Sequence, residues 1–235
     1  MIDFYYMEIM MVEKKKKWFR ISIWLLAVAV IYTVLVKYVD VKAIGPGSTK
    51  VGFATMNGWF KDLIGYNKMF YTISKYAGVI PFGFCACYGL LGFIELIKKK
   101  SLKKVDYRYY ILACFYVIFV AMYFFFEKVA INYRPIIVDV KEGIEASYPS
   151  THTLLAICLC GSSLIVSKFF IKNETLRKLF DIAAWLLMVV IVVARLISGV
   201  HWLSDIIGGI IISLTYLSFL RLSLIRMDEK DLTTA

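Results

Sequence analysis

The stretch PSTHTLLAICLCGSSLIVSKFFI, residues 149–171, joins a short polar start to a long, mainly apolar run. A helix that crosses a bilayer needs about 20 mainly apolar residues, so this stretch predicts a spanning helix over residues 152–171. Pro149 ends the preceding loop, and Ser150 or Thr151 can cap the first turn. We therefore expect His152 in the first helical turn, at a membrane surface.

The rest of the chain repeats this apolar pattern. Comparable runs occupy residues 18–39, 76–97, 109–126, 179–194 and 203–225. Hydrophobic residues make up 60% of the chain, against about 45–50% in soluble domains. The sequence therefore predicts an all-α fold, a polytopic membrane helical bundle with six transmembrane helices. We expect residues 1–235 to form a single membrane-embedded domain.

Positive charge gathers between the apolar runs. The net charge is +11, and the Lys and Arg residues cluster at 14–20, 98–108, 168–178 and 221–230. Cytoplasmic loops carry such an excess, so both termini are predicted to be cytoplasmic, and segments 40–75, 127–151 and 194–202 to face outward. Because no basic stretch alternates with stacking aromatic residues, we expect the lipid bilayer as a partner and no nucleic acid.

The outward segment 40–75 contains the turn signal Gly45-Pro46-Gly47 followed by apolar residues around Trp59. This pattern predicts a turn and a short amphipathic piece in the membrane interface. The piece could be a lid or lipid guide, or a simple packed connector.

Two groups of residues could suggest a metal site. The five cysteines all lie inside apolar runs, at Cys85, Cys87, Cys114, Cys158 and Cys160. Small buried hydrophobic residues are the plainer interpretation of them. The loop carboxylates Asp139, Glu142 and Glu145 could bind a divalent ion or form a solvated acidic face. The motifs described next require no metal, and we expect no cofactor.

The last of three outward-facing polar motifs contains His201. If a helix begins near His201, then His201 and Asp205 are four residues apart and share a face. The carboxylate can accept one imidazole N–H, which leaves the other nitrogen free to attack phosphorus. Arg195 lies six residues earlier, across a predicted turn at Ser198-Gly199, and its guanidinium can bind two phosphate oxygens.

The other two motifs add an acid and more cations. His152 stands beside the free N–H groups of a helix start and can protonate a leaving oxygen. Ser150 can add a hydroxyl donor. Arg134 and Lys128, after the third apolar run, can stabilise charge on the equatorial oxygens of a phosphoryl group. Each residue alone could be an ordinary interfacial side chain, but together they predict phosphoryl-transfer chemistry.

The three motifs resemble those of the type 2 phosphatidic acid phosphatase superfamily, which also includes the vanadium haloperoxidases. The family pattern is Lys-x6-Arg-Pro, Pro-Ser-Gly-His and Ser-Arg-x5-His-x3-Asp. The matching residues are Lys128 with Arg134-Pro135, then Pro149-Ser150-Thr151-His152, then Ala194-Arg195 with His201 and Asp205. They span residues 128–205, the core of the predicted domain.

The resemblance implies a role for each residue. His201 would be the nucleophile, Asp205 its orienting partner and His152 the general acid. The implied phosphate binders are Lys128, Arg134, Ser150, Thr151 (through its backbone) and Arg195. The resemblance also implies a helical bundle with a metal-independent site at the outer membrane–water boundary, acting on lipid phosphates and pyrophosphates.

Three positions depart from the family pattern. Only five residues separate Lys128 from Arg134, which leaves the role of the lysine open. Thr151 replaces a glycine and adds a side chain beside the phosphate site, while Ala194 replaces a serine and removes a hydroxyl donor. None of these changes removes a nucleophilic or proton-transferring group.

We therefore predict a multi-pass cell-membrane protein that hydrolyses a lipid phosphate or pyrophosphate through a phosphohistidine at the extracytoplasmic face. Undecaprenyl pyrophosphate, phosphatidylglycerol phosphate and phosphatidic acid are the candidate substrates. The alternatives are a lipid phosphotransferase with the same site, a transporter or binding protein for a phosphorylated lipid, and a structural membrane protein.

Overall fold

The computed structural model describes the backbone of residues 2–234 and the side chains of residues 9–225. Helices dominate this part of the chain, as predicted. Their bounds are α1 (Ile2–Tyr38), α2 (Ala54–Ile64), α3 (Lys68–Ala77), α4 (Ile80–Lys99), α5 (Tyr107–Lys128), α6 (Thr151–Leu155), α7 (Gly161–Phe170), α8 (Glu174–Ile197) and α9 (Leu203–Thr234). The π-helical segment η3 (Ala156–Cys160) joins α6 to α7, and short 3-10 turns form η1 (Pro46–Ser48) and η2 (Leu102–Lys104). A small antiparallel hairpin, β1 (Lys42–Ala43) and β2 (Lys50–Val51), and an isolated bridge between Tyr133 and Ala146 depart from the all-α prediction.

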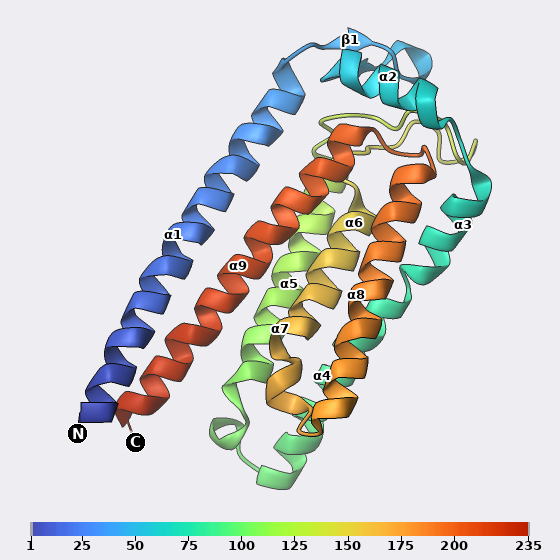
Figure 1. Ribbon diagram of the computed structural model, residues 1–235. Helices are drawn as coiled ribbons and strands as arrows, with labels where there is room; N and C mark the ends of the chain where they lie inside the picture. The colour runs from blue at the N-terminus through green and yellow to red at the C-terminus, as the bar shows by residue number, and fades with distance from the viewer. Residues whose placement is uncertain (1, 235) are drawn as a thin grey trace.

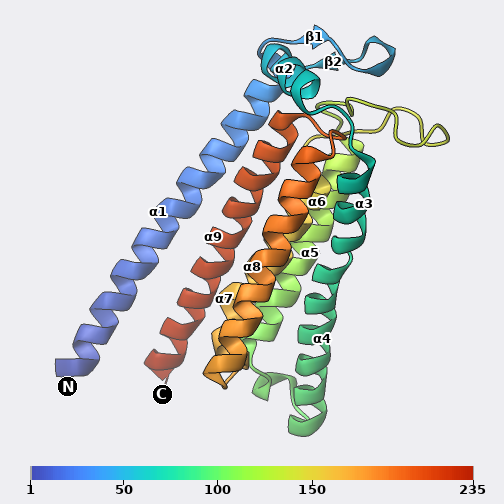
Figure 2. The same ribbon diagram turned by 45° about the vertical axis from the view of Figure 1, so that its right-hand side comes forward.

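Six runs in the described part of the chain are long and apolar enough to cross a membrane, which is the predicted number. They are Ile9–Tyr38, Lys68–Lys99, Tyr107–Lys128, Thr151–Phe170, Glu174–Ile197 and Leu203–Ile225. The helices run side by side along a common direction in both views of the bundle (Figures 1 and 2). The fold is therefore all-helical and consistent with a polytopic membrane protein.

The first, second and fifth runs begin at Ile9, Lys68 and Glu174, well before their predicted starts at residues 18, 76 and 179. Residues 68–75, which we expected in an outward loop, belong to α3, and α3 packs along α8. Helix α8 begins at Glu174 instead of residue 179, because the Asn173 side chain caps it by accepting the Leu176 N–H at 2.9 Å. The spanning helices therefore include polar first turns. The predicted ranges left these turns out because they followed the apolar residues alone.

The two ends of the bundle carry different segments. Helix α2, the β-hairpin and the loop between α5 and α6 gather at one end, here called the loop end (Figure 1). The start of α1, the end of α9 and the α4–α5 connection lie at the opposite end (Figure 1). The predicted outward segments therefore lie together, apart from residues 68–75.

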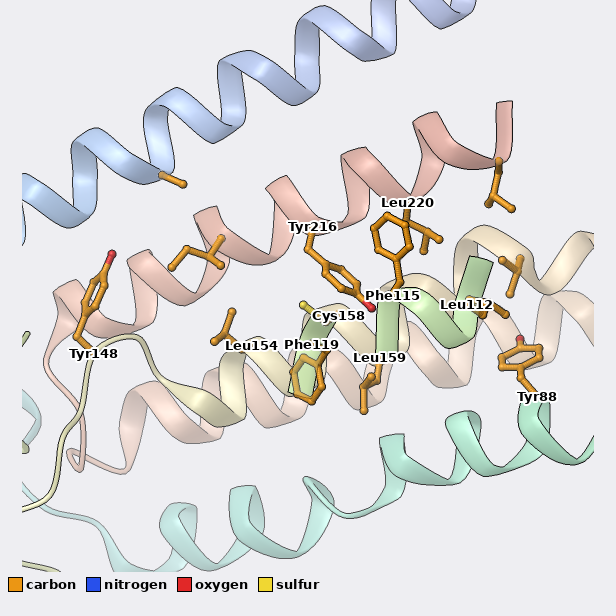
Figure 3. Packing of buried hydrophobic residues seen from close by; sticks show 14 of the residues in the cluster. Tyr88, Leu112, Phe115, Phe119, Tyr148, Leu154, Cys158, Leu159, Tyr216 and Leu220 are labelled. Atoms are coloured by element: carbon orange, nitrogen blue, oxygen red, sulfur yellow. The ribbon is translucent and has the colours of Figure 1, made fainter. Parts of the chain in front are cut away.

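The helix run that contains His152 is the centre of the bundle. In its most apolar window 67% of the residues are buried, against 17% for the run in α1. Figure 3 shows Leu154 and Cys158 of this run beside Tyr216 of α9 and Phe119 of α5. Cys158 and Cys160 are buried as expected. Cys87 and Cys114 are instead exposed on outer helix faces, where lipid would cover them.

Two glycines allow α9 to approach the start of α6. A Cβ atom at Gly208 would lie 2.4 Å from the Tyr148 ring, and one at Gly209 would lie 3.0 Å from the Thr153 side chain. Any side chain at these positions would push the two segments apart. This close packing brings the His152 motif next to the His201 motif.

Candidate active site

The three polar motifs meet at the loop end of the bundle. His201 lies in the turn between α8 and α9, His152 lies in the first turn of α6, and Arg134 lies in the loop after α5. Arg195 comes from the last turn of α8. Arg195, Arg134 and His152 all act electrostatically on the His201 ring. Groups from three other segments therefore act on one imidazole.

His201 lies two residues before α9, which begins at Leu203 as the sequence predicted. Its Nδ1 lies 3.0 Å from the carbonyl oxygen of Ser147, whereas the nearer carboxylate oxygen of Asp205 lies 3.7 Å away. Because a carbonyl can only accept, Nδ1 carries the proton. The tautomer is therefore set by a backbone group, not by the expected hydrogen bond to Asp205.

The other nitrogen of His201 is suited to nucleophilic attack. The residue is only 4% exposed, and its Nε2 has no hydrogen-bond partner among the described residues. Burial lowers the pKa of His201 well below its usual value, and the charges of Arg195 and Arg134 lower the pKa further. The ring is therefore neutral near pH 7, with the lone pair of Nε2 available.

Asp205 is fully buried at the start of α9. Its Oδ2 accepts the backbone N–H of Trp202 at 3.0 Å, which is one half of a capping box. Its Oδ1 accepts a hydrogen bond from the Asn132 side chain at 3.3 Å. These two contacts hold the carboxylate where it would stabilise a positive charge on His201.

Two buried asparagines, which the sequence analysis missed, join the loop end to α9. Asn57 of α2 accepts the Ser204 N–H at 3.1 Å and donates to the Ser204 hydroxyl at 2.8 Å. Asn132 accepts the Gly52 N–H at 3.0 Å. Helix α2 is thus a packed connector that helps to cap α9, which was one of the two alternatives for segment 40–75.

The start of α6 offers several donors to an anion. Ser150 is the N-cap, and its Oγ accepts from the Thr153 N–H at 3.4 Å and the Thr153 hydroxyl at 3.0 Å. Its own hydroxyl proton can still be donated. The N–H groups of Thr151 and His152 lie in the first turn, where helices lack internal acceptors. This arrangement suits phosphate oxygens.

Two arginines near His201 each keep one N–H donor that has no hydrogen-bond partner among the described residues. Arg195 is 1% exposed, donates from Nη1 to the Ser74 hydroxyl at 3.3 Å, and lies 5.4 Å from the Tyr71 ring. Arg134 pairs with Glu145 through Nη2 at 3.2 Å. The Nε atoms of both arginines are buried and have no partner among the described residues. Both can therefore bind an additional acceptor such as a phosphate oxygen.

The sequence profile of the PAP2 superfamily matches residues 82–226, a stretch that contains all three motifs. The chain belongs to the PAP2 superfamily. It is accordingly a membrane enzyme of the PAP2 phosphatase family, a lipid phosphate hydrolase.

A solved structure supports the same fold. It is the crystal structure of the first transmembrane PAP2-type phosphatidylglycerolphosphate phosphatase, from Bacillus subtilis, with a TM-score of 0.53 and 16% sequence identity. The match covers 89% of this chain and 96% of that one. At this identity the likeness establishes the fold alone. No curated protein matches the chain.

Helix α3 lies outside the PAP2 match, yet it forms one wall of the site. It supplies Ser74 and Tyr71 to Arg195, and a Cβ atom at Gly78 would lie 3.0 Å from the His152 ring. The charge of Lys75 also acts on His152. The sequence analysis missed this wall, although a serine and a lysine at the head of an apolar run were a visible signal.

Lys128 takes no part in these contacts. The residue is exposed at the last turn of α5, and no hydrogen bond or ion pair connects it to the site within the described residues. Its assignment as a phosphate binder stays a prediction, with Lys75 as the competing cation.

Within residues 9–225, no three His, Cys, Asp or Glu side chains gather as metal ligands. Glu145 instead pairs with Arg134, and Asp139 accepts the backbone N–H of Lys141 at 2.9 Å. The side chains of Asp139 and Glu145 are therefore used in local contacts.

Proposed function

We propose that this PAP2 protein hydrolyses a lipid phosphate or pyrophosphate through a phosphohistidine on His201, without a metal. The observation that carries the proposal is the buried, neutral and unpartnered Nε2 of His201 beside two guanidinium groups. Undecaprenyl pyrophosphate, phosphatidylglycerol phosphate and phosphatidic acid are the candidate substrates. The like-folded Bacillus subtilis enzyme makes phosphatidylglycerol phosphate the first substrate to test.

In the first step, Nε2 of His201 attacks phosphorus and the bond from phosphorus to the leaving oxygen breaks. His152 donates its proton to that oxygen. Arg134, Arg195, the Ser150 hydroxyl and the Thr151 N–H bind the equatorial oxygens, and either Lys128 or Lys75 adds a further charge. The His201 ring becomes positively charged, and the Asp205 carboxylate 3.7 Å from Nδ1 stabilises it.

In the second step, water attacks the phosphohistidine and His152 takes the proton of the water. The N–P bond breaks, phosphate leaves, and His201 returns to its neutral form with the proton still on Nδ1. The Ser147 carbonyl accepts the hydrogen bond from Nδ1 at 3.0 Å in both steps.

The whole chain acts as one domain, with the loop end on the extracytoplasmic side and both termini in the cytoplasm.

The test uses purified protein, lipid phosphates and a chelator. We expect His201→Ala to abolish phosphate release and the phosphohistidine trapped by an alkaline denaturing quench, while the variant still shows a cooperative unfolding transition. His152→Ala should slow lipid phosphate hydrolysis by about 10²–10⁴-fold. It should slow an aryl phosphate much less, because a good leaving group needs no acid.

Each rival function predicts a different outcome. A phosphotransferase would deliver the phosphoryl group to another acceptor without release of phosphate. A transporter or binding protein would show no phosphohistidine in the parent protein. Normal turnover by folded His201→Ala would refute the assigned nucleophile.

A further inference from the structure

A groove of about 420 Å³ lies between α1, α7, α8 and α9. This volume is within the range of about 300–1,000 Å³ that is usual for small-molecule sites. Much of its wall is apolar, formed by Leu164, Ile165, Met188, Leu214 and Leu217. Such a wall suits a hydrocarbon chain.

Three cations from three helices line the same groove. They are Lys14 of α1, Lys168 of α7 and Arg221 of α9, and the described residues that line the groove include no carboxylate. The Arg221 guanidinium lies 4.7 Å from the Trp18 ring. An aromatic face holds a cation without neutralising its charge. The groove therefore combines an apolar wall with a cluster of cationic side chains.

The groove covers one leaflet, on the side away from the candidate active site. Leu214 and Ile225 both line it and are separated by about 16 Å along α9, roughly half of a 30 Å hydrocarbon core. Arg221 lies about 24 Å along the same helix from Asp205. Figure 1 places the end of α9 opposite the loop end. The groove is thus separate from the site around His201.

We propose that this groove binds an anionic phospholipid of the leaflet opposite the active site. The phosphate of the headgroup lies against Lys14, Lys168 and Arg221, and an acyl chain lies along the apolar wall. A headgroup with net negative charge is favoured, because the three cations repel the extra positive group of a zwitterionic lipid. Helix α1 packs mainly on α9, so the lipid also joins α1 to α7 and α8.

The proposal is tested by native mass spectrometry of the whole protein in detergent, with phosphatidylglycerol or phosphatidylcholine added. Phosphatidylglycerol is a phosphodiester and has no terminal phosphate to release. We expect one phosphatidylglycerol to bind in preference to phosphatidylcholine, and each lost cation to weaken its binding about fivefold. The groove variant is Lys14→Gln, Lys168→Gln and Arg221→Gln together.

A matched control removes three charges at the same end but outside the groove, as Lys98→Gln, Lys100→Gln and Lys103→Gln together. The control should keep phosphatidylglycerol binding, and Leu164→Trp, which fills the groove and leaves the cations in place, should weaken it. Equal weakening in both triple variants would mean general charge attraction and overturn the proposal. Loss of phosphatidylglycerol binding in Arg195→Gln, which leaves the groove unchanged, would place the lipid in the active site and also overturn the proposal. Full binding by Leu164→Trp would rule out the acyl-chain position.

Discussion

The imidazole of His201 changes charge during the proposed reaction, and its surroundings suit both states. Before attack, burial and two nearby guanidinium groups keep the ring neutral. After attack, the Ser147 carbonyl at 3.0 Å and the Asp205 carboxylate at 3.7 Å face the positive ring. The bound phosphate meanwhile neutralises the arginines. The same pocket therefore supports the nucleophile and the phosphohistidine.

Stability should fall in acid because of His201. The unfolded chain binds a proton there near pH 6.5, whereas burial holds the pKa of His201 in the folded protein well below that value. The stability that the neutral ring contributes is complete above pH 6.5 and is lost as the pH falls toward the folded pKa. At pH 5 the loss should reach about 2 kcal/mol.

This effect is measured as the unfolding temperature in detergent at pH 7.5 and pH 5. His201→Gln should show a smaller acid drop than the parent protein. Thr55→Gln, at an exposed position on α2, is the control and should keep the full drop. If the unfolding temperature of His201→Gln fell in acid as much as that of the parent protein, His201 would not be the cause of the acid sensitivity.

The two candidate lysines can be separated by substitution. We expect Lys75→Gln to lower kcat/KM for phosphate release by about 10- to 100-fold, because its charge acts at His152, beside the phosphate-binding donors. Lys128→Gln should change kcat/KM little, since its charge is not among those that act on His152 or His201. Lys68→Gln, at the exposed start of α3, is the control. A large loss of kcat/KM in Lys128→Gln alone would instead support Lys128 as the phosphate-binding lysine.

At the scale of elements, helix ends position the chemistry. Helix α6 presents its first turn to the site, and α9 begins with a cap in which Asp205 accepts the Trp202 N–H. Helix α8 carries Arg195 in its last turn, and the turn that follows the helix carries His201. This turn must be tight, because Gly199 has φ +69° and lies directly against Gly65.

We expect Gly199→Ala to destabilise the protein and reduce its activity. A Cβ atom there would lie 1.9 Å from the Gly65 carbonyl oxygen, so the turn that holds His201 must move. Gly143→Ala is a matched control, because Gly143 has φ +71° but no atom within 4 Å of a Cβ. The control should cost about 1 kcal/mol of backbone strain alone.

Unfolding temperature and phosphate release measure both glycine variants. The difference between the two variants measures the effect of the contact with Gly65. We expect Gly199→Ala to lower the free energy of unfolding by several kcal/mol more than Gly143→Ala does. Equal effects would mean that the close approach to Gly65 is unimportant.

At the scale of the whole molecule, the Lys- and Arg-rich connections and the candidate active site lie at opposite ends of the bundle. The candidate site lies at the loop end, while Lys98, Lys168 and Arg221 belong to the other end of the bundle. Lys- and Arg-rich connections favour the cytoplasm, and on this ground we propose that the candidate site faces outward.

This orientation can be measured with a membrane-impermeant thiol reagent on intact cells. Lys141→Cys, in the loop after α5, should react without permeabilisation. Lys103→Cys, in the connection between α4 and α5, should react only after it. The parent chain gives the background from its own cysteines. The reverse pattern would place the candidate site in the cytoplasm and refute the orientation.

The sequence by itself determined the six apolar runs and the three motifs, because hydrophobic length and the spacing of polar residues are local properties. It also placed His152 in a first helical turn. Only the tertiary structure decided that the Ser147 carbonyl binds His201, that Asn57 caps α9, and that Ser74 of α3 contacts Arg195. Each of these contacts joins segments more than fifty residues apart. Such partners depend on how the helices pack, and no local pattern in the chain records that packing.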